Sequence, residues 1–415
     1  MSINETKSSL PFVTEPARDL PVTASVDVLV CGGGVAGIAA ALAARRTGAS
    51  VLLLEREYLL GGLATAGLIA MYLPICDGRG RQVCFGIAEE LLRLSVSRGG
   101  EDRHENPWLT GSADPEAKKH IRFLTQYNPQ LFAILAEQLL TAEGADILYG
   151  TSVCAALTDA GHITHIIIEN KSGRSAVKVG CVVDATGDAD VCRLAGEDTD
   201  VFRQGNVPAG WYCDTLGGTY NLRVVGACDK PDSRKSADEL ERDRASLRFA
   251  GLEADELSRL TRLSHKLTLD DFLSRGEDSP SHALATVATV PQIRMTRRLA
   301  GVYTQDETEI GVRYDDSVGL FPDWRHAGPV YEMPLRTLYG HRIGNLLAAG
   351  RCISGTDAMW DITRVIPVCA VSGQAAGTAA AMCARRQCGV SVLDVTELQG
   401  RLSAAGVRLH DELGS

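Results

Sequence analysis

Residues 27–55 read DVLVCGGGVAGIAAALAARRTGASVLLLE, and this stretch decides the fold. An apolar run precedes three consecutive glycines, and the alanine-rich segment after them ends with two arginines and Gly48. Cationic residues and a following glycine are typical of the C-terminal end of a helix. A second apolar run completes the unit. The sequence therefore predicts a β-α-β unit, with strands over 27–31 and 50–55 and a helix over 38–47.

The glycines of this unit match a dinucleotide-binding pattern. Gly32, Gly34 and Gly37 form G-x-G-x-x-G between strand and helix, and Glu55 closes the second strand. The first glycine allows a tight turn, the second lets a pyrophosphate approach the backbone, and the third lets the helix pack on the strand. The helix N-terminus stabilises phosphate charge, and Glu55 can accept hydrogen bonds from a ribose diol. We therefore predict dinucleotide binding; a glycine-rich turn without a ligand is the structural alternative.

Two further regions fit an extended ligand. A second small-residue loop, GGLATAG at residues 61–67, follows the carboxylate and would let a ligand continue past the pyrophosphate. From 151 to 179, short alternating segments separated by turns predict a hairpin meander. An apolar strand over 181–187 follows and ends in small residues.

Composition excludes several classes of protein. The net charge of −10 argues against a broad positive surface for nucleic acid. The 12 cysteines include no C-x-x-C pair, which argues against a disulfide framework or a metal site and for reduced thiols in the cytoplasm. Residues 365–384 carry no charge, but their small and polar residues predict a helix packed inside the protein and not a membrane span. The first 21 residues lack the apolar run of a signal peptide and predict a loose tail.

These motifs resemble those of FAD-dependent oxidoreductases in the glutathione-reductase-like superfamily. The resemblance rests on the glycine fingerprint, Glu55-Arg56, the loop at 61–67, the meander and the ATG at 185–187. Later motifs extend it: PQIR at 291–294, MPLR at 333–336, NLLAAGR at 345–351, RVIP at 364–367 and GQAAG at 373–377.

The resemblance implies an α/β fold, in which an FAD-binding Rossmann-like parallel sheet with a β-meander carries an inserted α+β substrate domain. The implied division is a flexible tail (1–21), a first FAD-binding part (22–200) with a candidate lid loop (101–120), a substrate or cap domain (201–338), a last FAD-binding part (339–392) and a C-terminal helix or tail (393–415).

FAD is the implied cofactor, and its contacts can be assigned by position. The glycine turn would face the pyrophosphate, Glu55 the adenosine ribose, and Val153 the adenine through its backbone. The helix after Arg364 would direct its N-terminus at the pyrimidine edge of the flavin, where negative charge develops on reduction. Arg351 stands where many relatives carry Asp. The full implied set is Gly32, Gly34, Val35, Ala36, Gly37, Glu55, Arg56, Gly61, Gly62, Leu63, Ala64, Thr65, Val153, Ala185, Thr186, Gly187, Gly350, Arg351, Ile366 and Pro367.

Four residues are candidates for catalysis. An arginine such as Arg294, if it faces the flavin, would bind a carboxylate or stabilise an enolate. Asp361 and Arg364 stand three apart, the spacing of an ion pair on a helix, or of an acid held as a proton relay. Tyr72 follows the second glycine loop. Other polar residues near this region are equally open to a structural reading: Arg297, Arg298, His326, Tyr331, Arg336 and Asp357. The charge-rich stretch 229–278 predicts a pair of solvated helices.

Two motifs that related enzymes carry are missing, and their absence limits the reactions expected of this chain. Disulfide reductases of the superfamily carry C-x-x-x-x-C soon after the ribose carboxylate, but no cysteine occurs between Cys31 and Cys76. Cys383 and Cys388 have that spacing at the far end of the last predicted core helix. No second G-x-G-x-x-G provides a separate domain for NAD(P)H.

We therefore expect a cytoplasmic FAD-dependent oxidoreductase that transfers a hydride between flavin N5 and a small organic substrate, as a dehydrogenase or an enoate/fumarate-type reductase. Its expected partner is that substrate, with no nucleic acid, no metal and no membrane span, and a homo-oligomer is an open expectation. The alternatives are a non-catalytic FAD-fold binding or escort protein and an NAD-dependent dehydrogenase.

Overall fold

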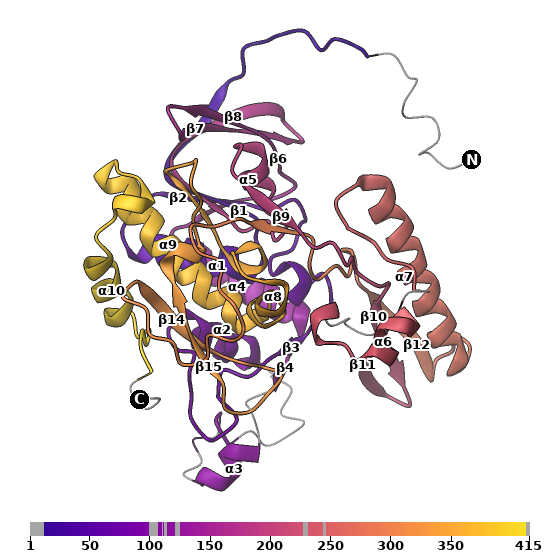
Figure 1. Cartoon of the computed structure of the whole chain (residues 1–415). Helices are drawn as coiled ribbons and strands as arrows, with labels where there is room; N and C mark the ends of the chain where they lie inside the picture. The colour runs from indigo at the N-terminus through magenta and orange to yellow at the C-terminus, as the bar shows by residue number, and fades with distance from the viewer. Residues whose placement is uncertain are drawn as a thin grey trace.

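The computed structural model describes residues 12–98, 107–109, 111, 114–120, 125–226, 231–243 and 246–411. One mixed sheet forms the centre of its main body (Figure 1). In spatial order the sheet consists of β5 (Asp146–Leu148), β2 (Val51–Leu54), β1 (Val22–Cys31), β8 (Gly173–Asp184), β7 (His162–Asn170) and β6 (Ser152–Asp159), with β16 (Leu346–Ala348) also paired to β8. Strands β5, β2, β1, β8 and β16 run parallel, and β7 and β6 form the antiparallel meander. The predicted α/β fold is confirmed.

Strand β8 is longer than the sequence predicts, and it forks the sheet. One strand replaces the two short strands expected around Gly180, because that glycine lets β8 lie close to β1: a Cβ there would be 2.8 Å from the Asp27 carbonyl oxygen. The first half of β8 pairs with β7 and the second half with β16. The Asn345 side chain fills the fork, since it accepts from the Ile163 N–H at 2.7 Å and donates to the Ile163 and Gly180 carbonyls.

Two small-residue helices lie against each other in the core. Helix α1 (Val35–Arg46) packs on α9 (Ile366–Arg386). Cβ atoms at Gly373 and Gly377 would lie only 2.3 and 2.1 Å from carbonyl oxygens of α1, so the two backbones touch. In the part of the chain that the structure describes, α9 is the one helix long and apolar enough to cross a membrane, and its most apolar window is wholly buried inside the protein. The predicted packed helix at 365–384 is confirmed.

Other elements cover the two faces of the sheet. Helices α2 (Ile87–Val96) and α4 (Pro129–Ala142) complete the layer formed by α1 and α9. On the opposite face, α5 (Asp190–Leu194) packs with the meander strands. Helix α10 (Val395–Ala404) lies on α9 near the C-terminus, within the helix or tail predicted at 393–415.

A smaller unit stands beside this body, on the right of Figure 1. It contains a sheet of β11 (Thr219–Val225), β10 (Gly210–Leu216) and β12 (His282–Val287), with α6 (Ala237–Asp243) and α7 (Ala254–Ser274). These two helices lie in the stretch where charge density predicts a helix pair. Helix α7 packs on β10, and its buried residues recur at every fourth position: Leu260, Ser264, Thr268 and Phe272.

The chain returns to the main body before the predicted end of the cap. Strand β13 (Arg297–Leu299) pairs with β9 (Thr199–Val201), and the hairpin of β14 (Ser317–Pro322) and β15 (Val330–Pro334) packs against α9. We therefore propose that the cap comprises residues 202–296 and not 201–338.

Four predicted segments fall partly outside the described residues. The positions outside are 1–11 of the tail, 101–106, 110 and 112–113 of the candidate lid loop, 229–230 and 244–245 of the charge-rich stretch, and 412–415 of the C-terminal helix or tail. Apart from 3₁₀ helices, the remaining short elements are β3 (Met71–Tyr72), which pairs with β4 (Thr125–Gln126), and the helices α3 (Pro115–His120) and α8 (Asp357–Thr363).

Candidate functional site

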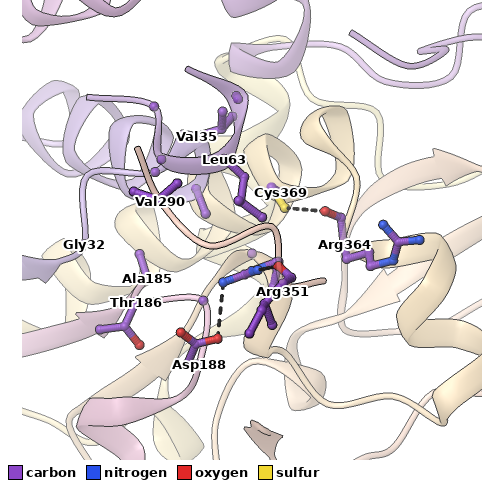
Figure 2. Close-up of a pocket in the computed structure, with 18 of the residues that line it drawn as sticks. Gly32, Val35, Leu63, Ala185, Thr186, Asp188, Val290, Arg351, Arg364 and Cys369 are labelled. Carbon is purple, nitrogen blue, oxygen red and sulfur yellow. Dashed lines mark hydrogen bonds and ion pairs between the residues drawn. The ribbon is translucent and has the colours of Figure 1, made fainter. Parts of the chain in front are cut away.

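A cavity of about 530 Å³ lies where the C-terminal ends of β1, β8 and β16 meet α1, α9 and the cap (Figure 2). Predicted cofactor positions from the beginning, middle and end of the chain line it: Gly32, Gly34, Val35, Ala36, Glu55, Arg56, Gly61, Gly62, Leu63, Ala64, Val153, Ala185, Thr186, Gly187, Gly350, Arg351 and Ile366. Gly37, Thr65 and Pro367 are not among the lining residues.

The three fingerprint glycines are required for different reasons. Gly32 has a left-handed backbone (φ +103°), and a Cβ there would lie 2.5 Å from the Ala185 carbonyl oxygen of the neighbouring segment. A Cβ at Gly37 would lie 1.8 Å from the Gly32 carbonyl oxygen, so Gly37 serves the packing of α1. Gly34 lines the cavity, and a Cβ there would meet no protein atom within 4 Å. The surface at Gly34 is therefore open to a ligand.

Backbone contacts join the two glycine loops. The Gly61 N–H donates to the Gly33 carbonyl at 2.7 Å, and Gly61 itself has a left-handed φ of +100°. The Thr65 hydroxyl donates to the Leu60 carbonyl and is fully buried. Thr65, a member of the implied cofactor set, therefore shapes the second loop from within.

Glu55 lies at the wall of the cavity, and part of the hydrogen-bonding capacity of its carboxylate is taken up by backbone N–H groups. One oxygen accepts the Gly33 N–H at 2.7 Å and the other accepts the Glu57 N–H at 2.9 Å. Burial raises the pKa of Glu55, although these two hydrogen bonds favour the ionised form. A carboxylate offers about four acceptor positions, so acceptor capacity is left for hydroxyl groups of a ligand.

Arg351 links three segments around the cavity (Figure 2). Its guanidinium donates to Asp188 at 3.2 Å and to the Ile293 carbonyl of the cap. It lies so close to Gly187 that a Cβ there would be 2.5 Å from a guanidinium nitrogen. Asp190, also at the wall, pairs with Arg297, and burial together with the carboxylates of Asp188 and Asp184 raises the pKa of Asp190 to about 6.

The N-terminus of α9 opens at the cavity. Ile366 and Cys369 line it because residues three apart share a helix face, whereas Pro367 lies between them on another face. The Cys369 thiol donates to the Arg364 carbonyl at 3.3 Å (Figure 2). Burial raises the pKa of Cys369 to about 12, so the thiol is neutral at ordinary pH.

Asp361 does not reach the cavity. Its carboxylate is buried and binds Arg364, with Arg234 at 3.2 Å and Arg325 at 3.6 Å. Arg364 lines the cavity, but its guanidinium binds Asp361 and points away from Arg351 in Figure 2. The expectation of a proton relay at Asp361 is therefore corrected: the buried carboxylate forms ion pairs with these arginines, of which Arg325 also pairs with Asp323 at 2.8 Å.

We expect Asp361→Asn to lower the free energy of unfolding by about 2 kcal/mol, because it removes the charge of a buried carboxylate that Arg364, Arg234 and Arg325 share. Urea denaturation measures this loss. Asp270→Asn is the matched control, since its ion pair with Lys266 is exposed and is expected to contribute less than about 0.5 kcal/mol. Equal effects of the two substitutions would contradict the role of Asp361.

Tyr72 is also placed away from the cavity. It is fully buried and its hydroxyl donates to the Ala88 carbonyl at 2.6 Å, whereas its neighbours Met71 and Leu73 line the wall. Successive side chains of a strand point to opposite sides. Tyr72 therefore faces the core, because the residues on either side of it face the cavity. Tyr72 is therefore not available to a substrate.

The remaining candidates divide sharply. Arg294 lines the cavity, and its guanidinium carbon lies 5.4 Å from the centre of the Trp211 ring. The others are not lining residues, and they contact protein groups: Arg297 with Asp190, Arg298 with Asp357, Arg336 with Asp316, Tyr331 with the Glu307 carbonyl and His326 with Arg234.

Sequence reasoning missed several lining residues. Asp188 and Asp190 directly follow the ATG at 185–187 and could have been found there. Cys369 follows from the helix spacing after Ile366. Nothing in the sequence marks Trp211 of the cap or Trp324, since neither belongs to a motif.

Comparisons with known proteins match this arrangement to a family. The family model described as FAD dependent oxidoreductase matches residues 27–248 and 236–402. A stretch of 71 residues, 17% of this chain, is 34% identical to thioredoxin reductase of Ureaplasma parvum serovar 3, and it spans only 23% of that relative.

Two of the solved structures that match the chain do so at low identity. A geranylgeranyl bacteriochlorophyll reductase-like protein from Thermoplasma acidophilum is 14% identical over 94% of each chain, with a TM-score of 0.45. A 3-ketosteroid-Δ4-(5α)-dehydrogenase from Rhodococcus jostii RHA1 is 15% identical over 87% of this chain and 97% of its own, with a TM-score of 0.39. At these values neither structure indicates a substrate or a reaction for this chain.

Proposed function

Because the chain belongs to the family of FAD-dependent oxidoreductases, we propose that it transfers a hydride between N5 of bound flavin and a carbon atom of a small organic substrate, as a dehydrogenase or an enoate/fumarate-type reductase. One observation carries the proposal: residues of the glycine fingerprint, the N-terminus of α9 and residues of the cap all line the same cavity. A cofactor and a second molecule can therefore meet there.

The residues present fit FAD. The open surface at Gly34 is a cradle that a side chain would fill, and it stands at the N-terminus of α1, where backbone N–H groups attract phosphate. Glu55 retains acceptor capacity for ribose hydroxyls. Gly61, Gly62 and Gly350 also line the wall, although a Cβ at Gly61 or Gly350 would collide with Thr65 or Ala36, so these two glycines serve the packing of the wall itself. We propose these residues as the cofactor-binding set.

Bound FAD would supply the hydride acceptor or donor. The chain's own part is electrostatic and steric. The N-terminus of α9 presents partial positive charge to the cavity, which would stabilise negative charge that develops there. Apolar cap residues beside Arg294 would exclude water from the reacting atoms.

FAD affinity is expected to fall as the pH is lowered. Burial raises the pKa of Glu55 above its ordinary range, so the free protein takes up this proton at a higher pH than an exposed glutamate does. Ribose hydroxyls donate to the carboxylate and favour its ionised form, so protonation competes with binding. Titration of the apoprotein with FAD by flavin fluorescence, from pH 7.5 down to pH 5, measures the effect. Glu55→Gln should bind more weakly and lose this pH dependence; an unchanged dependence would assign it to another group.

Anaerobic titration of the purified flavoprotein tests the function. A panel of carboxylates, alcohols and amines is added to oxidised protein, and the same panel with unsaturated acids to chemically reduced protein. Bleaching or recovery of the flavin colour by one class supports hydride transfer. A flavin that no panel member reduces or reoxidises supports the escort reading, and a colourless chain that binds NAD would support the NAD-dependent alternative.

We also propose that the protein acts in the cytoplasm on a small-molecule substrate, without nucleic acid or a membrane span. The burial of α9 supports the last point for the described residues. We also propose a homo-oligomer, which sedimentation analysis tests.

A further inference from the structure

The last segment of the cap runs along the cavity without forming a helix or a strand. This segment, residues 289–296, lies between β12 and β13, and we call it the strap. It contributes Val290, Pro291, Ile293 and Arg294 to the cavity wall, together with Leu63 and Arg351 from the main body (Figure 2). A ligand that fills the cavity therefore lies against the strap.

One end of the strap is held by the second glycine loop. The Thr289 N–H donates to the Ala66 carbonyl at 2.9 Å, and the Gln292 side-chain amide donates to the Gly67 carbonyl. Gln292 is only 4% exposed and is not a lining residue. Its side chain therefore joins the strap to the loop and does not point into the cavity.

The other end of the strap is held beside Asp188. The Thr296 hydroxyl donates to Asp188 at 2.6 Å, and Arg351 donates to the Ile293 carbonyl. Asp188 and Arg351 both line the cavity. The strap therefore connects the glycine loop at 61–67 to the wall at Asp188, and a ligand that extends from one to the other contacts it.

Protein groups alone make these contacts, and most of them are single side-chain hydrogen bonds. Between residues 289 and 296 the described backbone forms no strand, so no ladder of backbone hydrogen bonds joins the strap to the main body. A segment held in this way can open when a few hydrogen bonds break, without unfolding of the central sheet.

We propose that the strap is a gate for the cofactor and that Gln292 is the latch of this gate. FAD enters and leaves only when residues 289–296 move away from the loop at 61–67. The inference rests on the proposed cofactor-binding set and not on the proposed hydride transfer. Gln292 acts as a positioning residue, because it touches the loop and not the cavity.

The hydrogen bonding of Gln292 supports this role. Its Oε1 atom is buried and accepts no hydrogen bond from the described residues. A buried acceptor without a donor is costly for folding. Gln292 is therefore poorly suited to a purely structural role, whereas its Nε2 makes the contact that closes the strap on the loop.

A gate changes rates more than affinity. The contact between Gln292 and Gly67 does not involve the cofactor, so its loss favours opening in the free protein and in the FAD-bound protein alike. Opening is required for both entry and exit, so both rate constants should rise. A residue that contacts the cofactor directly would instead change the dissociation constant, mainly through the dissociation rate.

Stopped-flow measurement of flavin fluorescence on the full chain tests the gate. Gln292→Met keeps the size of the side chain and removes the donor. We expect the association and dissociation rate constants of FAD to rise about 10-fold each, with a change of less than about twofold in the dissociation constant. Thr296→Val, at the other end of the strap, should also raise both rate constants, and it replaces Gln292→Met if that variant does not fold.

Gln305→Met is the matched control. The Gln305 amide is also buried and donates to a main-chain carbonyl, that of Glu332 at 2.7 Å, but neither residue lines the cavity. This variant loses the same kind of hydrogen bond, so it reports any general effect of lost stability. Its two rate constants should equal those of the wild type.

Hydrogen exchange of the apoprotein measures the opening itself. In Gln292→Met the amide proton of Thr289, which donates to the loop, should exchange about 10-fold faster than in the wild type. The amides of α10, which lies away from the strap, should exchange at unchanged rates. Unchanged exchange at Thr289 would show that Gln292 does not hold the strap.

The outcomes separate the gate from the cofactor site on which it rests. An association rate constant that rises with the dissociation rate constant supports the gate. An association rate constant that does not rise overturns it, whatever happens to dissociation. A Gly34→Val protein with full flavin content would instead contradict the cofactor-binding set itself.

Discussion

Replacement of Gly34 by valine is expected to abolish stable FAD binding and to leave the fold intact. Gly34 has an ordinary backbone conformation (φ −64°), and a Cβ there meets no protein atom within 4 Å. The Cβ of the added side chain therefore meets no protein atom, and the side chain occupies the space where the pyrophosphate is expected. An overlap of about 3 kcal/mol corresponds to a loss of about 100-fold in affinity.

Flavin content per purified chain measures the loss of FAD binding. The thermal midpoint of the apoprotein shows whether the fold is intact. Gly37→Ala is the matched variant with the opposite outcome. Its Cβ would lie 1.8 Å from the Gly32 carbonyl oxygen, so it should cost more than about 3 kcal/mol of folding free energy even without cofactor. A Gly34→Val protein that purifies with full flavin would disprove the assignment of the cradle.

Replacement of Gly377 by alanine should destabilise the chain by more than about 3 kcal/mol. The new methyl group would lie 2.1 Å from the Ala40 carbonyl oxygen of α1. That oxygen belongs to the main chain of a helix and cannot rotate aside as a side chain could. This loss exceeds the roughly 1 kcal/mol that alanine gains over glycine within a helix. Urea denaturation of the apoprotein, which excludes any effect of bound flavin, measures the change.

Gly400→Ala in α10 is the control for helix propensity. A Cβ there meets no atom within 4 Å, so the substitution should stabilise the chain by roughly 0.5–1 kcal/mol. A Gly377→Ala variant as stable as Gly400→Ala would show that α1 and α9 can separate at little cost.

The sequence predicted the backbone of this site well, because glycine motifs encode backbone geometry directly. Gly32 and Gly37 stand where a side chain would collide with main-chain atoms, and such positions leave a readable pattern. Membership of the family confirms FAD as the cofactor. The longer β8 was missed because a glycine inside a strand resembles a break when its neighbouring strand is unknown.

Side-chain directions were predicted less well. Spacing alone suggested an ion pair between Asp361 and Arg364 and left a catalytic acid open; the further arginines around Asp361 come from segments distant in sequence. Tyr72 was chosen by proximity to a motif, yet its neighbours Met71 and Leu73 face the cavity. Trp211 comes from the cap, whose placement no local pattern encodes.

The fork at Asn345 has a consequence for biosynthesis. Strand β1 is translated early. However, β8 pairs with β16 and α1 packs on α9, and both partners are translated only after more than 340 residues. Contacts so distant along the chain delay folding. We therefore expect nascent chains stalled before residue 340 to remain sensitive to protease, and cofactor capture to be a post-translational event.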